Sequence, residues 1–275
     1  METKTKQLKK DLLTWYTNNK RSFSWRNTND PWKILLIEMI SQQTQINRAD
    51  TYYQKFIKRF PTPESMSKSS LKTILKMWSG LGYNNRAKRL YESSKILAEQ
   101  GFEGIYPNFE ILPGVGPYTK NAILSFAYGD NVLAVDTNLQ RIIIRYFGID
   151  NTKDYVKEYS NLLLKDINSR DLNQAFMDFG SSICKSSNPT CNICPIENSC
   201  SKYFSINKRS KEKFKGSNRE VRGKIIKLLI NNGHINNQKL FEEINEDTDK
   251  VEKALEGLKK DNLIKFKKNN IIEIN

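Results

Sequence analysis

All four cysteines of the chain lie in one short segment. They follow the spacing C-x6-C-x2-C-x5-C, at Cys184, Cys191, Cys194 and Cys200. Four thiolates gathered in this way can hold one metal centre, whereas packing alone gives no reason to place every thiol in one loop. Zinc and an iron–sulfur cluster both fit such a set. Zinc sites usually consist of two tight pairs, so a single C-x2-C with longer arms on both sides favours an iron–sulfur cluster.

A carboxylate, Glu38, stands in the middle of an otherwise apolar helical run. Its neighbours at helical spacing include Ile34 and Leu35, so a position on an exposed polar face fits poorly, although Ser41 and Gln42 lie on that same face. Carboxylates are rarely buried without a partner or a purpose, and burial raises their pKa towards neutrality. Glu38 is therefore a candidate general acid.

A second carboxylate, Asp136, ends the apolar stretch 132–135 and precedes a helix rich in isoleucine. It has two interpretations. Aspartate is a good N-cap for the helix that follows. An acid behind an apolar wall that faces a bound polyanion could instead stabilise positive charge, and this segment by itself does not decide between the two.

Two glycines, Gly114 and Gly116, form a G-x-G turn within Leu112–Thr119, where a helix is expected to begin. Backbone N–H groups without side chains around them can approach an anion, and the helix N-terminus favours negative charge. A phosphate is the natural ligand of such a turn. An ordinary helix–helix turn is the alternative, because G-x-G alone is a weak signal.

The elements that carry these residues are predicted to be almost entirely helical up to Phe204. From Lys202 to Lys215 six basic residues stand against one acid, which indicates a linker or a basic strap. The remainder, from Arg219 to Asn275, shows two helical stripes and a third helix that Asp249 could cap.

Two short runs near the end of the chain, Leu263–Phe266 and Ile271–Ile274, flank a Lys-Asn-Asn turn and predict a hairpin. The only histidine, His234, is expected in a turn of the same region. Three helices followed by a hairpin predict a small winged-helix-like module.

The composition gives a formal net charge of +15 with 38% hydrophobic residues, too many for a disordered chain. The longest apolar runs are far too short to span a bilayer, and the charged first thirteen residues lack the apolar core of a secretory signal. We therefore expect a soluble cytoplasmic protein, associated with a bacterial-type nucleoid, without a membrane partner. The charge favours nucleic acid as a partner, with a solvated lysine-rich surface as the alternative.

Taken in order, these motifs resemble the helix–hairpin–helix DNA glycosylase superfamily with an iron–sulfur loop, and within it the adenine DNA glycosylases of the MutY type. The resemblance covers residues 22–204 and rests on five landmarks: Trp25-Arg26, Glu38 with Gln42–Gln45, Gly80–Tyr83, Leu112–Thr119 leading to Asp136, and the four cysteines.

The resemblance implies an all-α fold: a glycosylase core over 1–205, a basic linker over 206–218 and a winged-helix-like domain over 219–275. Within the core it implies a six-helix and hairpin subdomain over 22–135. An iron–sulfur subdomain would consist of 1–21 and 136–205.

The implied activity is that of a mono-functional glycosylase of base excision repair, which removes adenine opposite 8-oxoguanine or guanine in double-stranded DNA. Glu38 would protonate the adenine ring, and Asp136 would stabilise the oxocarbenium ion at the sugar. Tyr118 and Asn138 would support that intermediate. The enzyme would act as a monomer.

Other residues would bind the base, the DNA and the cofactor. The adenine pocket would be lined by Trp25, Arg26 and Gln174. Gln43 would fill the gap left by the extruded base, with Thr44 and Tyr83 beside the lesion base, and Gly114 and Gly116 would hold the DNA backbone. The four cysteines would ligate a [4Fe-4S] cluster.

Three alternatives remain at this point. Endonuclease III-like lyases carry a lysine where this chain has Tyr118, and Lys120 is expected to face another way. Thymine glycosylases that act on G:T mismatches share the tyrosine but generally lack the glutamate, so Glu38 favours adenine. A non-catalytic iron–sulfur DNA-binding regulator would leave Glu38 and Asp136 unexplained.

The chain also departs from the family in two ways. Ser41 stands where adenine glycosylases usually have a leucine, which implies a wetter pocket. A winged-helix-like segment takes the place of the Nudix-like domain that helps to recognise 8-oxoguanine in longer members, so the resemblance leaves open the preference between 8-oxoguanine and guanine.

Overall fold

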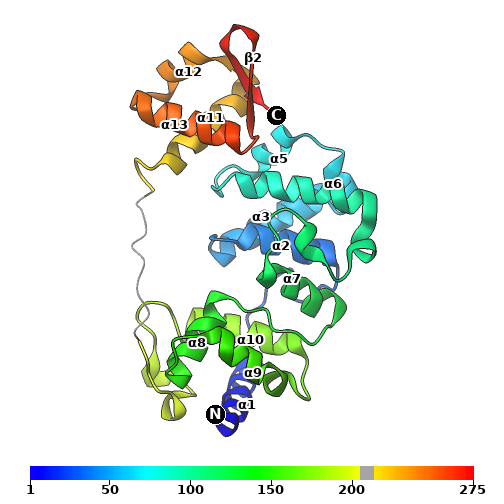
Figure 1. Cartoon of the computed structure of the whole chain (residues 1–275), viewed down its shortest axis with the longest axis vertical. Helices are drawn as coiled ribbons and strands as arrows, with labels where there is room; N and C mark the ends of the chain where they lie inside the picture. Colours follow the sequence, from blue (N-terminus) through cyan, green and yellow to red (C-terminus); the bar gives the residue numbers. More distant parts are fainter. Residues whose placement is uncertain (205–213) are drawn as a thin grey trace. The chain divides into compact units, whose positions relative to one another are not determined.

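The computed structural model describes residues 1–204 and 214–275 (Figure 1). Its α-helices are α1 (Glu2–Asn19), α2 (Pro31–Ser41), α3 (Ile46–Arg59), α4 (Pro63–Ser67), α5 (Leu71–Trp78), α6 (Asn85–Ile105), α7 (Pro117–Ile123), α8 (Thr137–Phe147), α9 (Thr152–Leu164), α10 (Ser169–Ser182), α11 (Asn218–Asn232), α12 (Asn237–Ile244) and α13 (Thr248–Lys260). A π-helical turn (Leu124–Tyr128) and short 3-10 turns (Phe109–Ile111, Cys191–Ile193, Glu197–Ser199, Lys268–Asn270) connect them. The strands are β1 (His234–Asn236), β2 (Ile264–Lys267) and β3 (Ile271–Ile274). None of the described helices combines the length and the apolar character that crossing a membrane requires.

The chain divides into two compact units. The first consists of Met1–Glu38, Pro107–Glu110 and Val115–Lys208, and the second of Met39–Tyr106, Ile111–Gly114 and Arg209–Asn275.

The first unit is built around α1, α8, α9 and α10, which pack together (Figure 1). Apolar residues at helical spacing supply its core, for example Leu8 and Leu12 of α1, Ile143 of α8 and Phe176 of α10, each at most 1% exposed. Three of the four cysteines pack against the edge of this core. The core of the unit therefore supports the cysteine loop directly.

The second unit contains the helices from α3 to α6 and the C-terminal module, which we define as residues 214–275. In this module α11 packs against α13, and the strands form an antiparallel sheet in the order β1-β3-β2. Ile235 pairs with Ile272, and Phe266 pairs with the same residue from the other side. This arrangement of three helices and a hairpin is the predicted winged-helix-like fold.

The details of this module differ from the prediction in two places. Asp247, not Asp249, caps α13, because its carboxylate accepts from the backbone N–H of Lys250 at 3.3 Å. His234 lies in strand β1 rather than in a turn, since pairing with β3 extends a segment too short to show its own alternation. Residues 205–213, which include most of the predicted basic linker, lie outside the described residues.

Candidate active site and cysteine centre

Glu38, on α2, is buried as the apolar run predicts, with 6% of its surface exposed. Burial raises its pKa to about 7, the charge of Asp136 adds to this rise, and a hydrogen bond with Tyr118 opposes it. Tyr118, on α7, has a pKa well above its usual value because of its own burial and the two nearby carboxylates, so its hydroxyl stays protonated and donates. The structure therefore brings Glu38, Tyr118 and Asp136 together within the first unit, although they come from three separate segments.

Asp136 caps α8. Its Oδ1 accepts from the backbone N–H of Leu139 at 2.7 Å, and its Oδ2 accepts from Asn138 Nδ2 at 2.6 Å. Burial raises the pKa of Asp136, and the two donors oppose the rise because they bind the ionised form. The N-cap interpretation is confirmed. Asp136 thus accepts two hydrogen bonds at the start of α8, while burial raises the pKa of Glu38 to about 7.

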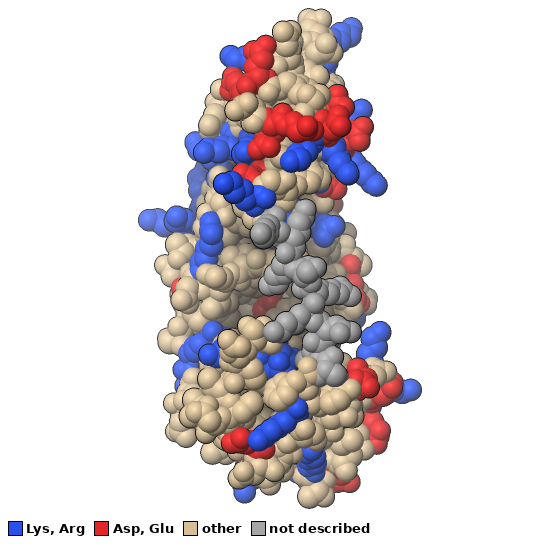
Figure 2. All heavy atoms as spheres, turned by 90° about the vertical axis from the view of Figure 1, so that its left-hand side faces the viewer, with Lys and Arg blue, Asp and Glu red and all other residues tan. Residues whose placement is uncertain are grey.

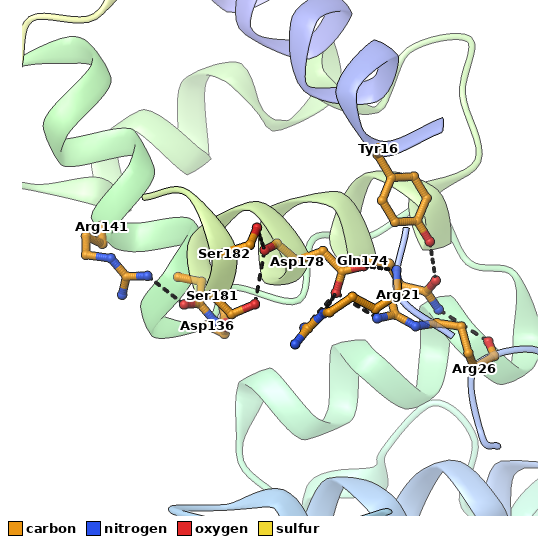
Figure 3. A network of polar contacts seen from close by, with 10 residues as sticks. Tyr16, Arg21, Arg26, Asp136, Arg141, Gln174, Asp178, Ser181 and Ser182 are labelled. Atoms are coloured by element: carbon orange, nitrogen blue, oxygen red, sulfur yellow. Dashed lines mark hydrogen bonds and ion pairs between the residues drawn. The ribbon is translucent and has the colours of Figure 1, made fainter. Parts of the chain in front are cut away.

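Arg141, drawn near Asp136 in Figure 3, connects this aspartate to the cysteine loop through Asn138. Its Nη2 donates to Asn138 Oδ1 and to the Gly180 carbonyl, both at 2.7 Å, while its Nε donates to the Cys184 carbonyl at 2.7 Å. Gly180 is also required sterically, because a Cβ there would lie 2.5 Å from the Cβ of Asn138. One guanidinium thus fixes the orientation of Asn138, and through it that of Asp136.

Two of the predicted base-pocket residues, Arg26 and Gln174, belong to a second polar network, also drawn in Figure 3. Tyr16 Oη donates to Gln174 Oε1 at 2.7 Å, and Gln174 Nε2 donates to the Arg26 carbonyl at 3.4 Å. Arg26 Nη2 donates to Asp178 at 2.7 Å, and Arg21 binds the same carboxylate. This network holds Arg26 and Gln174 in place between the N-terminal segment and α10.

Asp178 is a residue that the sequence analysis missed. It is fully buried and forms ion pairs with Arg21 and Arg26. One sequence feature could have pointed to it. Asp178 is an acidic residue one helical turn after Gln174, on the helix face that also carries the core residues Ala175 and Phe179.

Three buried N–H groups of Trp25 and Arg26 have no partner among the residues that the structure describes. They are Trp25 Nε1, Arg26 Nε and Arg26 Nη1. The Arg26 guanidinium lies 5.3 Å from the centre of the Trp25 ring, which stacks on Phe23 at 5.4 Å. Buried donors without acceptors are costly, so this group is suited to a ligand that offers acceptors on a flat surface.

The four cysteines line one cavity, whose wall is otherwise mostly apolar and includes Ile142, Phe179 and Ile196. Arg145 is the charged residue there: it donates to Cys184 Sγ at 3.5 Å and to the Lys185 carbonyl at 2.6 Å. Burial raises the pKa of Cys194 to about 11, so a thiolate there needs a positive centre.

Within 1–204 and 214–275, no three cysteine, histidine or acidic side chains meet closely enough for a single metal ion. Four thiols that line one mostly apolar cavity, with N–H donors to Cys184 and Cys200, fit a centre with four thiolate ligands.

The predicted DNA-contact residues Gln43, Thr44 and Tyr83 belong to the second unit. Gln43 and Tyr83 are exposed and both have left-handed backbones, with φ of 54° and 49°. The sequence analysis missed their common anchor, the buried Arg86, which donates to the carbonyls of Ile40 at 3.0 Å and Gly82 at 3.2 Å. Arg86 also donates to Thr44 Oγ1 at 3.3 Å.

The two hairpin glycines serve different local needs. Gly114 has φ of 88°, and a Cβ there would meet Met39 at 2.7 Å. Gly116, in the first unit, is the N-cap residue of α7.

A helical core with a glycine hairpin, two neighbouring carboxylates and a four-cysteine cavity can be compared with known proteins, and the comparison identifies the class as a DNA-repair fold. Residues 36–166 match the family described as "HhH-GPD superfamily base excision DNA repair protein". The adenine DNA glycosylase of Mycolicibacterium smegmatis is 31% identical over 80% of this chain and 79% of its own length. That of Buchnera aphidicola (subspecies Baizongia pistaciae) is 41% identical over 74% of this chain and 61% of its own.

A solved structure of a thermostable thymine-DNA glycosylase is 31% identical, with a TM-score of 0.67, over 74% of this chain and 98% of its own. The chain therefore belongs to the HhH-GPD superfamily of base excision DNA repair proteins. The predicted family and fold class are confirmed. The chain spans about three fifths of the length of the Buchnera relatives that it matches.

Proposed function

We propose that the protein is a mono-functional DNA glycosylase that removes adenine opposite 8-oxoguanine or guanine. The observation that carries this proposal is the pairing of the buried Glu38 with the half-buried Asp136, in which Glu38 keeps its proton up to a pH near its pKa of about 7. Two carboxylates with different affinities for a proton are the requirement for acid-assisted cleavage of a glycosidic bond.

In the proposed reaction Glu38 gives its proton to a ring nitrogen of adenine while the bond between base and sugar breaks. The electron pair of that bond leaves with the base, and positive charge develops on the sugar. Asp136 stabilises this charge, with Asn138 holding the carboxylate in position. Water then adds to the sugar, and no strand is cut.

The pocket around Arg26 supports a purine as the excised base. Trp25 and Arg26 supply three buried donors without acceptors among the described residues, and adenine offers ring nitrogens as acceptors on a flat surface. The base must leave the duplex to reach such a pocket. The exposed Gln43, on its left-handed turn, supports the role of the residue that fills the gap.

The cysteine cavity supports a [4Fe-4S] cluster held by Cys184, Cys191, Cys194 and Cys200. When bound, such a cluster would supply four metal–thiolate bonds that hold together the loop of residues 184–200. Arg141 and Arg145, both on α8, hold the start of this loop through hydrogen bonds to the carbonyls of Cys184 and Lys185.

Thymine opposite guanine is the second candidate substrate, because the thermostable thymine-DNA glycosylase shares 31% identity with this chain. Glu38 argues for adenine, since thymine gives no ring nitrogen as basic as those of adenine. A lyase activity has less support, because Lys120 Nζ pairs with Glu110 at 3.1 Å.

The experiment is a gel assay on four duplexes, which carry A opposite 8-oxoguanine, A opposite guanine, T opposite guanine, or an oxidised pyrimidine. We expect adenine release from the first two without strand cleavage until alkali is added. Thymine release would replace the proposal with the second candidate, and direct nicking would indicate a lyase.

A further inference from the structure

Tyr83 is contacted by two arginines that are far apart in the sequence. The guanidinium carbon of Arg86 lies 5.7 Å from the centre of the Tyr83 ring, and that of Arg219 lies 5.2 Å from it. Arg219 Nη1 also donates to Tyr83 Oη. Because Arg219 is on α11, and α11 packs against α5, the C-terminal module contacts the turn that carries Tyr83.

The start of α11 holds Arg219 at a defined place. Ser217, which is 4% exposed, caps the helix by accepting from the backbone N–H of Glu220. The Glu220 carboxylate in turn accepts from the backbone N–H of Gly216 at 2.6 Å. These two bonds fix the first turn of the helix, so Arg219 is presented by a rigid segment.

The turn before Tyr83 is fixed from the other side. Arg48 donates to the Gly80 carbonyl and Tyr52 to the Ser79 carbonyl, both at 2.6 Å. Tyr83 itself is 39% exposed on a left-handed backbone, a conformation that non-glycine residues adopt at a cost. An exposed aromatic ring with guanidinium groups beside it has the composition of a stacking platform for nucleic-acid bases.

The rest of the module mixes acidic and basic side chains on the face drawn in Figure 2 and along α13. On the face drawn in Figure 2, acidic side chains gather on this part of the chain among the lysines. Helix α13, the third helix of the module, mixes acids with its lysines, including Glu252 and Glu256. A surface of mixed charge gives little attraction to phosphates. The contact of α11 with Tyr83 is therefore the better-supported route by which the module could affect DNA binding.

We propose that Arg219 is a positioning residue that holds the Tyr83 ring against the base opposite the excised adenine, so that the C-terminal module takes part in recognising that base. The family resemblance puts Tyr83 beside the lesion base, and the contact with Arg219 links the C-terminal module to that residue. After adenine leaves the stack, the opposite base exposes a face on which an aromatic ring can stack. This inference rests on the proposed function.

The test compares Arg219→Ala, Arg219→Lys, Tyr83→Phe and the double variant Arg219→Ala/Tyr83→Phe. Lys227→Ala is the control, because it removes one charge from an exposed position of the same helix. Single-turnover rates and duplex affinities are measured with A opposite 8-oxoguanine and A opposite guanine. We expect Arg219→Ala to lower the affinity for the 8-oxoguanine duplex about tenfold. The difference in affinity between the 8-oxoguanine and guanine duplexes should therefore become smaller. Lys227→Ala should bind both duplexes as the wild type does.

Coupling decides whether Arg219 acts through Tyr83. We expect the double variant to bind no worse than Arg219→Ala alone, and Arg219→Lys to recover little, because an ammonium cannot both stack on the ring and donate to its hydroxyl in the same geometry. Additive losses, or full rescue by lysine, would overturn the proposal and leave Arg219 as a simple phosphate contact.

A readout without catalysis separates this proposal from the proposed function. Hydrogen exchange at residues 79–83 should be faster in Arg219→Ala than in the wild type and in Lys227→Ala. If the wild type releases no adenine, the proposed function fails while the exchange result still judges the Arg219–Tyr83 contact. Unchanged exchange in an enzyme that releases adenine would contradict the positioning role alone.

Discussion

Asn138 donates to Asp136 across 2.6 Å, and the same asparagine accepts from Arg141 at 2.7 Å through its other side-chain atom. A flip of the Asn138 side-chain amide by half a turn would therefore break both hydrogen bonds. Its Oδ1 and Nδ2 atoms are assigned to different partners, so Arg141 determines which way Asn138 faces Asp136. Arg141 therefore fixes the orientation of the Asp136 carboxylate through the intervening side chain of Asn138.

Asp136→Asn should strongly slow base release while leaving duplex affinity within about threefold of the wild type. Asparagine can still cap α8, but it carries no charge to stabilise the sugar cation, so we expect the single-turnover rate to fall by a factor of about 10²–10³. Asp171→Asn, the same chemical change at an exposed position of α10, is the control. Wild-type turnover in Asp136→Asn would refute the assignment.

Glu38→Gln should lower the rate by a factor of about 10²–10⁴ and change its dependence on pH. The wild-type rate should fall as pH rises through about 7, because the acid loses its proton there. Glutamine has no such proton to lose, so the remaining activity should lack this descending limb. Single-turnover rates between pH 5.5 and 8.5 measure the effect; the same descending limb in both proteins would assign it to another group.

The same substitution should stabilise the folded protein at high pH. The pKa of Glu38 is raised on folding from 4.5 to about 7, so its contribution to stability is fully present below 4.5 and is lost as pH rises through 7. At pH 8 Glu38→Gln should therefore unfold at a higher denaturant concentration than the wild type. Its free energy of unfolding should be larger by up to about 3 kcal/mol. At pH 4.5 the two should be nearly equal, and equal stability at pH 8 would contradict the buried position.

Gly180→Ala should impair catalysis although alanine is the better helix former. The added Cβ would lie 2.5 Å from the Cβ of Asn138 and must displace it. A displacement near 1 Å at the reaction centre costs about a hundredfold in rate. Gly223→Ala is the matched control: its Cβ would meet nothing within 4 Å, so it should stabilise α11 by about 0.5–1 kcal/mol and leave activity unchanged.

Arg141→Lys should lower both base release and iron content. Lysine keeps the charge but cannot bond the Cys184 carbonyl and Asn138 at once. Loss of such outer contacts usually costs about 10- to 100-fold in activity or metal affinity. Arg59→Lys, at an exposed position of α3, controls for the change of residue type. Full iron content and full activity in Arg141→Lys would show that the connection has no role.

The local features of this protein were predictable because they depend on near neighbours in the sequence. The burial of Glu38 followed from apolar residues at helical spacing, and α8 after Asp136 followed from a capping residue before an isoleucine-rich stretch. The hairpin of the C-terminal module followed from two short apolar runs around a turn. Each pattern spans fewer than about twenty residues and is set by backbone periodicity.

Only the tertiary structure shows which residues from distant segments contact each other. Asp178 gains Arg21 and Arg26 from the N-terminal segment, and Arg219 reaches Tyr83 across more than a hundred residues. No periodicity records such pairs, because they arise where packed helices bring side chains together. The sequence by itself determined the two carboxylates and the four thiols as chemical groups. Packing decided which donors surround them, and those donors together with burial set the proton affinity of Glu38 and the orientation of Asp136.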